Sequence, residues 1–427
     1  MNNMPIPVAG VDISKRFSDM CIRAPDNSVF RRVKIIHDLT SMQQSLSALQ
    51  DAQTTFGDKP VIVMESTSHY HRLLWQFMTE AGYEVIVINP IQSGGLKNIH
   101  IRKVKNDKVD AYKIATLYRL KLLRPSHMPV QAIADLQALS RQHQDIKEDI
   151  TRQSNRLTAV LDQAFPGYDT IFSRITAVSS LAVLEQYPTP FHILAAGEGD
   201  LMALLVKASK CGVKFAAAKT AKLLEASRKA VWMGIRRDAD ALLIRSCVAT
   251  IRTMLANVQI IDAAMRRILA DNPAIDMNVR LLQTIPGIGE YGAIVLLSEI
   301  GDISLFQKPK QLTAYFGLDP SERQSGKFKG TKNKLSKRGS RYVRCVLNMA
   351  AVNSIYASAH GKVGNPVLAA YFEKKRASKP HKVAICAAMH KIVNIVFAVL
   401  RDQKPFELRL PEEHDRMLKE RNKLAAA

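Results

Sequence analysis

The first third of the chain alternates short apolar runs with stretches whose apolar residues recur at helical spacing. The expected strands are Val8–Ile13, Phe17–Arg23, Val29–Ile36, Val61–Met64 and Val85–Ile88. The expected helices are Thr40–Ala52, His71–Ala81 and Asp107–Leu120. Because the two Val/Ile-rich runs at 61–64 and 85–88 are typical of strands buried on both faces, we expect them in the middle of a helix-covered sheet. The pattern predicts a compact α/β domain.

The middle of the chain carries two long helical segments. The first, Leu136–Phe165, contains no glycine or proline and ends before Pro166. In the second, from about residue 236 to 270, apolar residues recur at alternating spacings of three and four. The series is Ile244, Val248, Ile251, Leu255, Val258, Met265 and Leu269, interrupted by Asp262. This is the seam of a coiled coil, formed either by an antiparallel pair within one chain or between subunits. Residues 173–231 are expected to form a small helical insertion.

From Val279 onward the pattern is helical and basic. Gly287 and Gly289 lie in a turn that precedes an apolar helix, where free backbone amides and the helix dipole favour an anion. Helix-hairpin-helix turns meet DNA phosphates in this way, and a plain packed helix hairpin has the same pattern. A run of basic residues interleaved with glycines and aromatics follows, which favours a phosphate-binding segment over a merely solvated face. Its candidate nucleic-acid contacts are Lys327, Lys329, Lys337, Arg338, Arg341 and Arg344.

Composition points to a polyanion as the partner. The 427 residues include 61 Lys and Arg against 38 Asp and Glu, a formal net charge of +23. Lys and Arg that replace counterions drive nucleic-acid affinity, and the 47% hydrophobic content excludes a wholly disordered chain. Five widely spaced cysteines without a CxxC argue against disulfide or zinc scaffolds and agree with a reducing cytoplasm. No apolar run reaches the ~18–20 residues of a membrane span, and no secretory signal is visible.

Four acidic residues of the α/β domain are candidates for a metal site. Asp12 and Glu65 end expected strands, and buried strands of a sheet bring their functional groups together at its carboxyl edge. Asp107 and Asp110 lie three residues apart at a helix start, hence on one face. Clustered carboxylates repel unless a cation neutralises them, and Mg²⁺ prefers such oxygen ligands. Two such ions stabilise both the attacking and the leaving oxygen of a phosphodiester.

Each of these acids also has an ordinary structural interpretation. Asp107 would serve as a helix N-cap, and Asp110 as a first-turn acid that complements the helix dipole. Glu65 would be a charge at a strand end. The four together, in a strongly basic chain, favour the metal site, with Mn²⁺ as an alternative to Mg²⁺.

The motifs resemble those of a known family. The segments Val8–Lys15, Met64–Thr67 and Lys105–Ala111 are similar to the DEDD motifs of insertion-sequence transposases with a Holliday-junction-resolvase-like domain. The segments 284–289, 316–318, 325–326 and 335–339 resemble the same family's C-terminal transposase domain. Pilin-gene invertases and bridge-RNA-guided recombinases are relatives. The chain departs from the pattern at His69, where many relatives have glycine, and at Asn106, where threonine is commoner.

The resemblance implies an organisation and a chemistry. Residues 1–125 would form an RNase-H-like DEDD domain, 126–275 a coiled-coil stalk with its insertion, 276–410 a C-terminal serine transposase domain and 411–427 a charged tail. Ser325 matches the family's serine that attacks DNA and forms a phosphoserine link, and neighbouring Lys and Arg would stabilise the charge developing on the phosphate. The DEDD acids would complete a composite active site with Ser325. A guide RNA would supply sequence choice, and the working unit would be a dimer or tetramer in the bacterial cytoplasm, associated with the nucleoid.

Two other functions remain open. A Holliday-junction resolvase would hydrolyse DNA with metal and would not need Ser325. A non-catalytic DNA-bridging protein would use the coiled coil for dimerisation and the glycine turns for phosphate contacts. Without the resemblance, Ser325 is simply a residue that precedes a glycine in a basic loop. Ser321, Ser336 and Ser340 are then equal candidates for the nucleophile.

Overall fold

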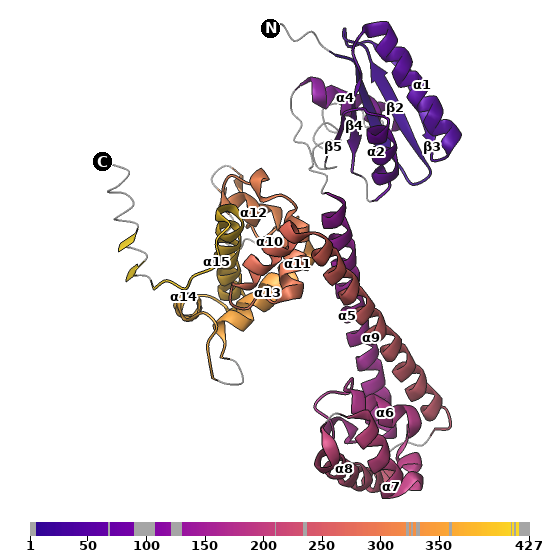
Figure 1. Ribbon diagram of the computed structural model, residues 1–427, viewed down its shortest axis with the longest axis vertical. Helices are drawn as coiled ribbons and strands as arrows, with labels where there is room; N and C mark the ends of the chain where they lie inside the picture. The colour runs from indigo at the N-terminus through magenta and orange to yellow at the C-terminus, as the bar shows by residue number, and fades with distance from the viewer. Residues whose placement is uncertain are drawn as a thin grey trace. The chain divides into compact units, whose positions relative to one another are not determined.

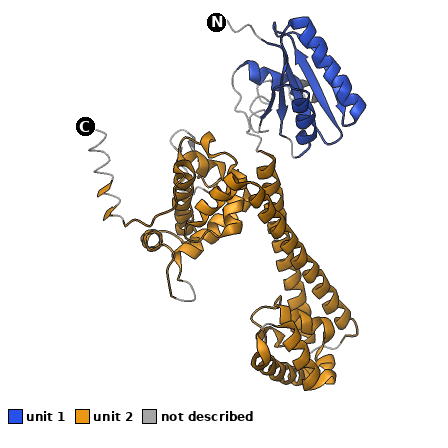
Figure 2. Ribbon diagram, viewed as in Figure 1, with its two compact units in different colours: residues 1–128 blue, residues 129–427 orange. Residues whose placement is uncertain are grey.

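The computed structural model divides the chain into two compact units, residues 1–128 and 129–427 (Figure 2). The structure describes residues 6–66, 69–88, 107–120, 130–209, 211–233, 237–321, 324–325, 328–329, 334–357, 361–410, 412–413 and 416–417. The predicted contact Lys327 and the predicted side-chain roles of Asp107, Ser325 and Lys329 lie outside this description.

The first unit is a mixed sheet with helices on both faces (Figure 1). Its strands are β1 (Val8–Ile13), β2 (Phe17–Arg23), β3 (Val29–Ile36), β4 (Val61–Glu65) and β5 (Val85–Ile88). Its helices are α1 (Leu39–Phe56), α2 (His71–Glu80) and α4 (Asp107–Arg119). The sheet order is β3-β2-β1-β4-β5, with β1, β2 and β3 antiparallel and with β4 parallel to both β1 and β5.

The prediction of two central strands is confirmed for β4, whereas β5 is at the edge of the sheet that the described residues form. β4 lies between β1 and β5, and all five of its residues are buried. β5 is the last strand of the described sheet, and its first two residues are only partly buried. A four-residue Val/Ile run is equally compatible with an edge strand when only part of it is covered, which the run itself does not reveal.

Two apolar clusters cover the opposite faces of this sheet. One joins the strands to α1 and α2 through residues such as Leu49 and Leu74. The other joins β1 and β4 to α4 through Ile114 and its neighbours. Local signals bound α1: the Asp38 carboxylate accepts a hydrogen bond from the Ser41 amide at 2.7 Å, and Gly57 ends the helix at φ 81°.

The second unit is organised around two long helices, α5 (Gln131–Ala164) and α9 (Asp240–Asp271), which pack side by side (Figure 1). Ile146 and Ile150 of α5 meet Val258 of α9, whereas Leu157 nearer the end of α5 shares a cluster with Ile244 at the beginning of α9. The pair is therefore antiparallel and lies within one chain. Of the two alternatives for the predicted seam, the structure shows this one.

Three helices form the insertion between α5 and α9: α6 (Val178–Gln186), α7 (Pro190–Ala208) and α8 (Gly212–Met233). They share a buried cluster with the adjoining parts of the long pair. Tyr168 is fully buried there, and its hydroxyl group hydrogen-bonds Ser180. Burial raises the pKa of the Tyr168 phenol.

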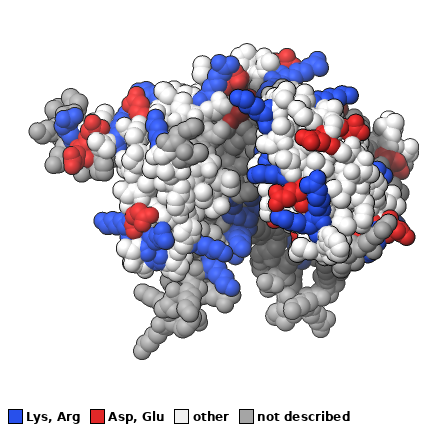
Figure 3. Space-filling view, turned by 90° about the horizontal axis from the view of Figure 1, so that it is seen from below, with Lys and Arg blue, Asp and Glu red and all other residues white. Residues whose placement is uncertain are grey.

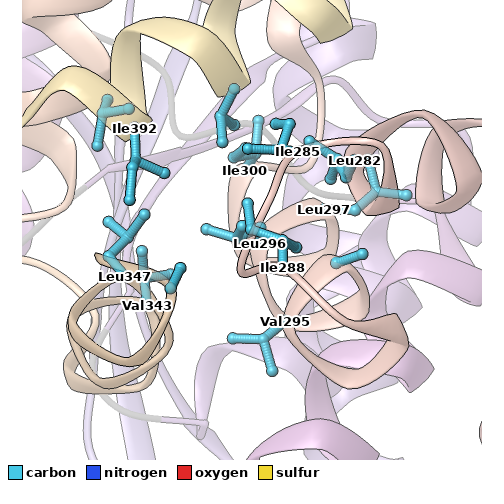
Figure 4. Packing of buried hydrophobic residues seen from close by; sticks show 14 of the residues in the cluster. Leu282, Ile285, Ile288, Val295, Leu296, Leu297, Ile300, Val343, Leu347 and Ile392 are labelled. Carbon is cyan, nitrogen blue, oxygen red and sulfur yellow. The ribbon is translucent and has the colours of Figure 1, made fainter. Parts of the chain in front are cut away.

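The C-terminal part of the second unit is a helical core. It comprises α10 (Pro273–Gln283), α11 (Glu290–Ile300), α12 (Pro309–Tyr315), α13 (Arg341–Ile355), α14 (Pro366–Arg376) and α15 (His381–Asp402). Figure 4 shows Leu296 of α11, Leu347 of α13 and Ile392 of α15 converging on its interior. A short hairpin, β6 (Gln324–Ser325) and β7 (Phe328–Lys329), interrupts the helices.

Two helices, α9 and α15, are long and apolar enough to cross a membrane by length and composition alone. More than half of the most apolar stretch of α15 is buried in the C-terminal core, and α9 packs along α5. A core helix of a soluble protein passes the same test, so both helices are weak evidence for a membrane span.

Candidate active site

Two predicted acids lie on the face of the sheet that α4 covers. Val8 of β1 and Val63 of β4 share a cluster with Ile114 of α4, which identifies that face. Side chains alternate between faces along a strand. Asp12, four residues after Val8, and Glu65, two residues after Val63, therefore lie on the α4 face as well. Glu65 is buried, with 7% of its surface exposed.

The register places these two acids at the same edge. β1 and β4 are parallel, and Val11 is the partner of Met64. Asp12 and Glu65 are the next residues of the two strands, so they end neighbouring strands side by side. The sequence prediction that strand ends would bring these carboxylates together is consistent with this register.

A glycine brings α4 into backbone contact with β1. A Cβ atom at Gly10 would lie 2.1 Å from the carbonyl oxygen of Ala111 and 2.6 Å from the amide nitrogen of Ala115. Only glycine allows this approach. Asp110 directly precedes Ala111 and is 9% exposed, so this third carboxylate lies on the helix that the close approach holds against β1. Its Oδ1 accepts a hydrogen bond from Lys113 Nζ at 3.2 Å.

The structure adds an acid that the sequence analysis missed. Asp19 of β2 is the register partner of Asp12 and is 9% exposed. Residues opposite each other in an antiparallel pair share a face, so Asp19 also lies on the α4 side. The available signal was a lone acid within a mostly buried strand that follows β1 after a three-residue turn.

These carboxylates, of which Asp19, Glu65 and Asp110 are buried and Asp12 is half-buried, are oxygen donors of the kind that Mg²⁺ prefers. Within the described residues, no three His, Cys, Asp or Glu side chains are grouped closely enough to hold a metal ion. Asp107 begins α4, and its side chain lies outside the description. The residue types and the shared face fit a divalent cation.

Ser325 lies in the β6–β7 hairpin, where it is the register partner of Phe328. Hydrogen bonds join the segment before this hairpin to the segment after it. The Ser321 amide donates to the Lys334 carbonyl at 2.7 Å, and the Ser336 amide donates to the Asp319 carbonyl at 2.8 Å. The segments on both sides of the hairpin are thus paired with each other before they join α12 and α13.

The predicted nucleic-acid residues fall into different environments. Lys337 and Arg338 are exposed and form no ion pair among the described residues. Arg341 is exposed but forms ion pairs with Asp145 and Glu148 of α5. Its hydrogen bond with Tyr342 raises the pKa of its guanidinium group, and the two carboxylates act in the same direction. Figure 3 shows Lys and Arg gathered in several groups on one face of the molecule, with acidic side chains beside some of them.

Arg344 differs from its neighbours because its guanidinium group is occupied by the protein itself. Its Nη1 donates hydrogen bonds to the Gly339 carbonyl at 2.7 Å and the Phe316 carbonyl at 3.1 Å. Arg344 is half-buried. These hydrogen bonds give Arg344 an internal role, and its predicted phosphate contact stays a prediction.

The two glycines of the predicted phosphate-binding turn also differ in their surroundings. A Cβ atom at Gly287 would lie 2.4 Å from the Ala350 carbonyl oxygen, so this glycine serves packing against α13. No atom lies within 4 Å of a Cβ at Gly289, the residue before α11. Glu290, the first residue of α11, carries a negative charge at the helix start and pairs with Arg266 at 2.9 Å. The packed-hairpin interpretation therefore explains Gly287 in this structure.

Comparisons with known proteins place the chain among transposases. A DEDD transposase family model named after IS110 matches residues 9–166, and a model described as "Transposase IS116/IS110/IS902 family" matches residues 279–371. The first match contains the candidate acids, and the second contains the serine hairpin. The chain belongs to the IS110/IS116 family of transposases.

Individual relatives agree with this assignment. An IS110 protein of 43.6 kDa from Streptomyces coelicolor is 22% identical over 87% of this chain and 89% of its own length. An IS116 protein from Streptomyces clavuligerus is 23% identical over 78% of this chain and 80% of its own. A pilin gene-inverting protein from Moraxella lacunata is 30% identical, but the match spans only 42% of this chain and 54% of that protein.

Proposed function

We propose that this transposase cuts and rejoins DNA through divalent-metal carboxylates and a covalent phosphoserine. The observation that carries the proposal is the shared position of Asp12, Glu65 and Asp110 on the α4 face. Asp107, which begins α4, completes the four acids. Carboxylates gathered on one face repel one another, and a divalent cation would relieve this repulsion.

In the proposed chemistry, Asp12, Glu65, Asp107 and Asp110 would hold Mg²⁺ or Mn²⁺, which would supply positive charge beside the phosphate. Ser325 Oγ attacks the phosphorus atom of one phosphodiester. The new Ser–O–P bond forms as the P–O bond to the leaving sugar breaks; the serine proton is released, and the leaving oxygen takes up a proton. A hydroxyl group of another DNA end later reverses the exchange, so the bond energy is conserved without ATP. Lys337 and Arg338 would stabilise the developing charge.

We further propose that a structured RNA selects the DNA sequences and that the protein works as a dimer or tetramer. Both proposals rest on the family resemblance and on the net charge of +23, which suits any polyanion. Base pairing would then supply specificity while the protein contacts backbones. A cytoplasmic, nucleoid-associated location follows from this role.

Variants of the acids test the proposal. Asp12→Asn, Glu65→Gln and Asp110→Asn each remove one negative charge with little change of shape. We expect each to abolish strand exchange on DNA from the element's ends while DNA binding persists. The matched control is Glu80→Gln, an exposed acid at the end of α2, which should retain activity. Full activity in all three site variants would contradict the proposal and favour a non-catalytic bridging protein.

A resolvase-like nuclease is the second candidate. The observation that favours it is that the acids occur in the first compact unit, whereas Ser325 belongs to the second. A metal-dependent hydrolase would need only the former. Loss of Ser325 distinguishes the two, because hydrolysis would survive it.

A further inference from the structure

Two backbone segments cross at the base of the hairpin that carries Ser325. A Cβ atom at Gly339 would lie 2.1 Å from the Tyr315 carbonyl oxygen, and one at Gly317 would lie 2.6 Å from the amide nitrogens of Arg338 and Gly339. Neither position accepts a side chain without backbone movement. Gly317 additionally has φ 67°, a conformation that glycine adopts without strain. The crossing is therefore a direct backbone-to-backbone contact between the segment before the hairpin and the segment after it.

One side chain joins both segments of this crossing. Arg344 Nη1 donates to the Phe316 carbonyl, which precedes the hairpin, and to the Gly339 carbonyl, which follows it. Hydrogen bonds from a charged donor are stronger than neutral ones, and neither carbonyl would be satisfied as well by a mobile water. Arg344 lies in the first turn of α13, beside Val343 and one turn before Leu347, both of which are fully buried in the C-terminal core (Figure 4). The crossing is thus tied to a rigid helix.

The order continues from the crossing toward the hairpin. The Lys337 amide donates to the Gly317 carbonyl at 3.0 Å, and Pro320 and Leu335 form an isolated antiparallel β-bridge. The Ser321–Lys334 hydrogen bond follows before β6 and β7 begin. The described hydrogen bonds between the two segments therefore begin at the crossing that Arg344 holds and reach Ser321 and Lys334.

We propose that Arg344 is a positioning residue for Ser325 and does not contact the DNA phosphate. By holding both carbonyl groups, it fixes the two ends of the hairpin and so presents residue 325 in one position. A misplacement of about 1 Å at a reacting group costs on the order of 10²-fold in rate. The positioning of Ser325 for catalysis rests on the proposed function. The ordering of the hairpin by Arg344 is independent of that function.

The ordering is tested by the mobility of residue 325 itself. A nitroxide label is attached to Ser325→Cys in a chain whose four incompletely buried cysteines, Cys211, Cys247, Cys345 and Cys386, are replaced by alanine. The variants are Arg344→Met, which keeps the packing of the stem, and Arg344→Ala. Arg376→Ala, an exposed arginine of α14, is the matched control. We expect narrower spectral lines in both Arg344 variants and an unchanged spectrum in the control, at melting temperatures that remain those of a folded protein.

Two further readouts separate positioning from phosphate binding. In the chain with Ser325 intact, Arg344→Met should leave the DNA affinity and its salt dependence unchanged while slowing covalent adduct formation about 10- to 100-fold. A reduction of about one in the slope of log binding constant against log salt concentration would show a phosphate contact and overturn the proposal. An unchanged spectrum would overturn it as well. If the lines narrow but the unaltered protein forms no adduct, the ordering by Arg344 stands and the assignment of Ser325 as nucleophile fails.

Discussion

Asp262 of α9 lies 3.3 Å from His143 of α5, in the middle of an otherwise apolar helix–helix contact. Asp262 is the residue that interrupts the apolar seam in the sequence. The His143 ring is buried and stacks on Tyr291 of α11 with ring centroids 4.2 Å apart. The interruption is therefore a polar pair, and it lies where the long helices meet the C-terminal core.

This pair predicts a pH dependence of stability. Burial lowers the pKa of His143, with Lys147 acting in the same direction and Asp262 opposing it only in part. The His143 Nε2 atom lies 3.3 Å from Asp262 Oδ1, and the buried Nδ1 atom has no hydrogen-bond partner among the described residues, so the neutral ring is favoured. Because the folded pKa lies below the unfolded value of about 6.5, this contribution is complete above that pH. It is lost as the pH falls through the folded pKa.

The measurement is the melting temperature between pH 8 and pH 5 for the unaltered protein and His143→Gln, which retains a donor toward Asp262. We expect the unaltered protein to lose more stability on acidification than the variant. Equal losses of melting temperature in the two proteins would show that His143 does not cause the pH dependence. A relative gain by the unaltered protein would show that the pKa is raised, as in a true ion pair.

Gly10 is predicted to control the position of α4. Its substitution by alanine forces the new Cβ against the backbone of α4, which has no flexible end to move aside. We expect a loss of about 1–3 kcal/mol in the unfolding free energy of the first unit, and a loss of strand exchange because α4, which carries Asp110, is displaced from β1. Thermal unfolding and the exchange assay measure the two effects.

The control for this prediction is Gly199→Ala, in α7, where a Cβ would meet nothing within 4 Å. Gly199→Ala should be neutral or slightly stabilising, since alanine favours a helix over glycine by up to about 1 kcal/mol. A Gly10→Ala protein as stable and active as the unaltered one would show that α4 tolerates displacement.

Arg338 is predicted to contact the nucleic-acid backbone. It is exposed beside the crossing, whereas Arg344, six residues later, is occupied internally. Arg338→Ala should weaken DNA binding for all sequences and reduce the salt slope by about one, because one fewer phosphate is neutralised. Arg344→Met serves as the contrasting variant, with an unchanged slope. The same slope for Arg338→Ala as for the unaltered protein would exclude Arg338 from the interface.

The sequence predicted the elements of the first unit well because periodicity is a local property. The runs at 8–13, 17–23 and 29–36 are the strands β1, β2 and β3 with the same bounds. Sheet order depends on contacts distant in the sequence, so the edge position of β5 did not follow from its residues. The same holds for Asp19, which becomes a partner of Asp12 only through the register of β1 and β2.

The basic C-terminal segment shows the converse limit. Its charge predicted phosphate contacts at Arg338, Arg341 and Arg344 alike, but a charge count does not reveal which side chains the fold already uses. Arg344 is held by backbone carbonyls, and Arg341 is paired with α5. The motif around Gly287 likewise describes a turn, while its environment is decided by α13. These assignments needed the packed structure.

The most direct test of the proposed function is to trap the protein on DNA. The unaltered protein, with any co-purifying RNA, Mg²⁺ and a nicked substrate from its element's ends, is denatured and examined for a covalent protein–DNA adduct, beside Ser325→Ala and Asp12→Asn. We expect an adduct that forms only when both Mg²⁺ and Ser325 are present. The Asp12→Asn variant should form no adduct. An adduct that persists in Ser325→Ala, or cleavage by the unaltered protein without any adduct, would contradict it.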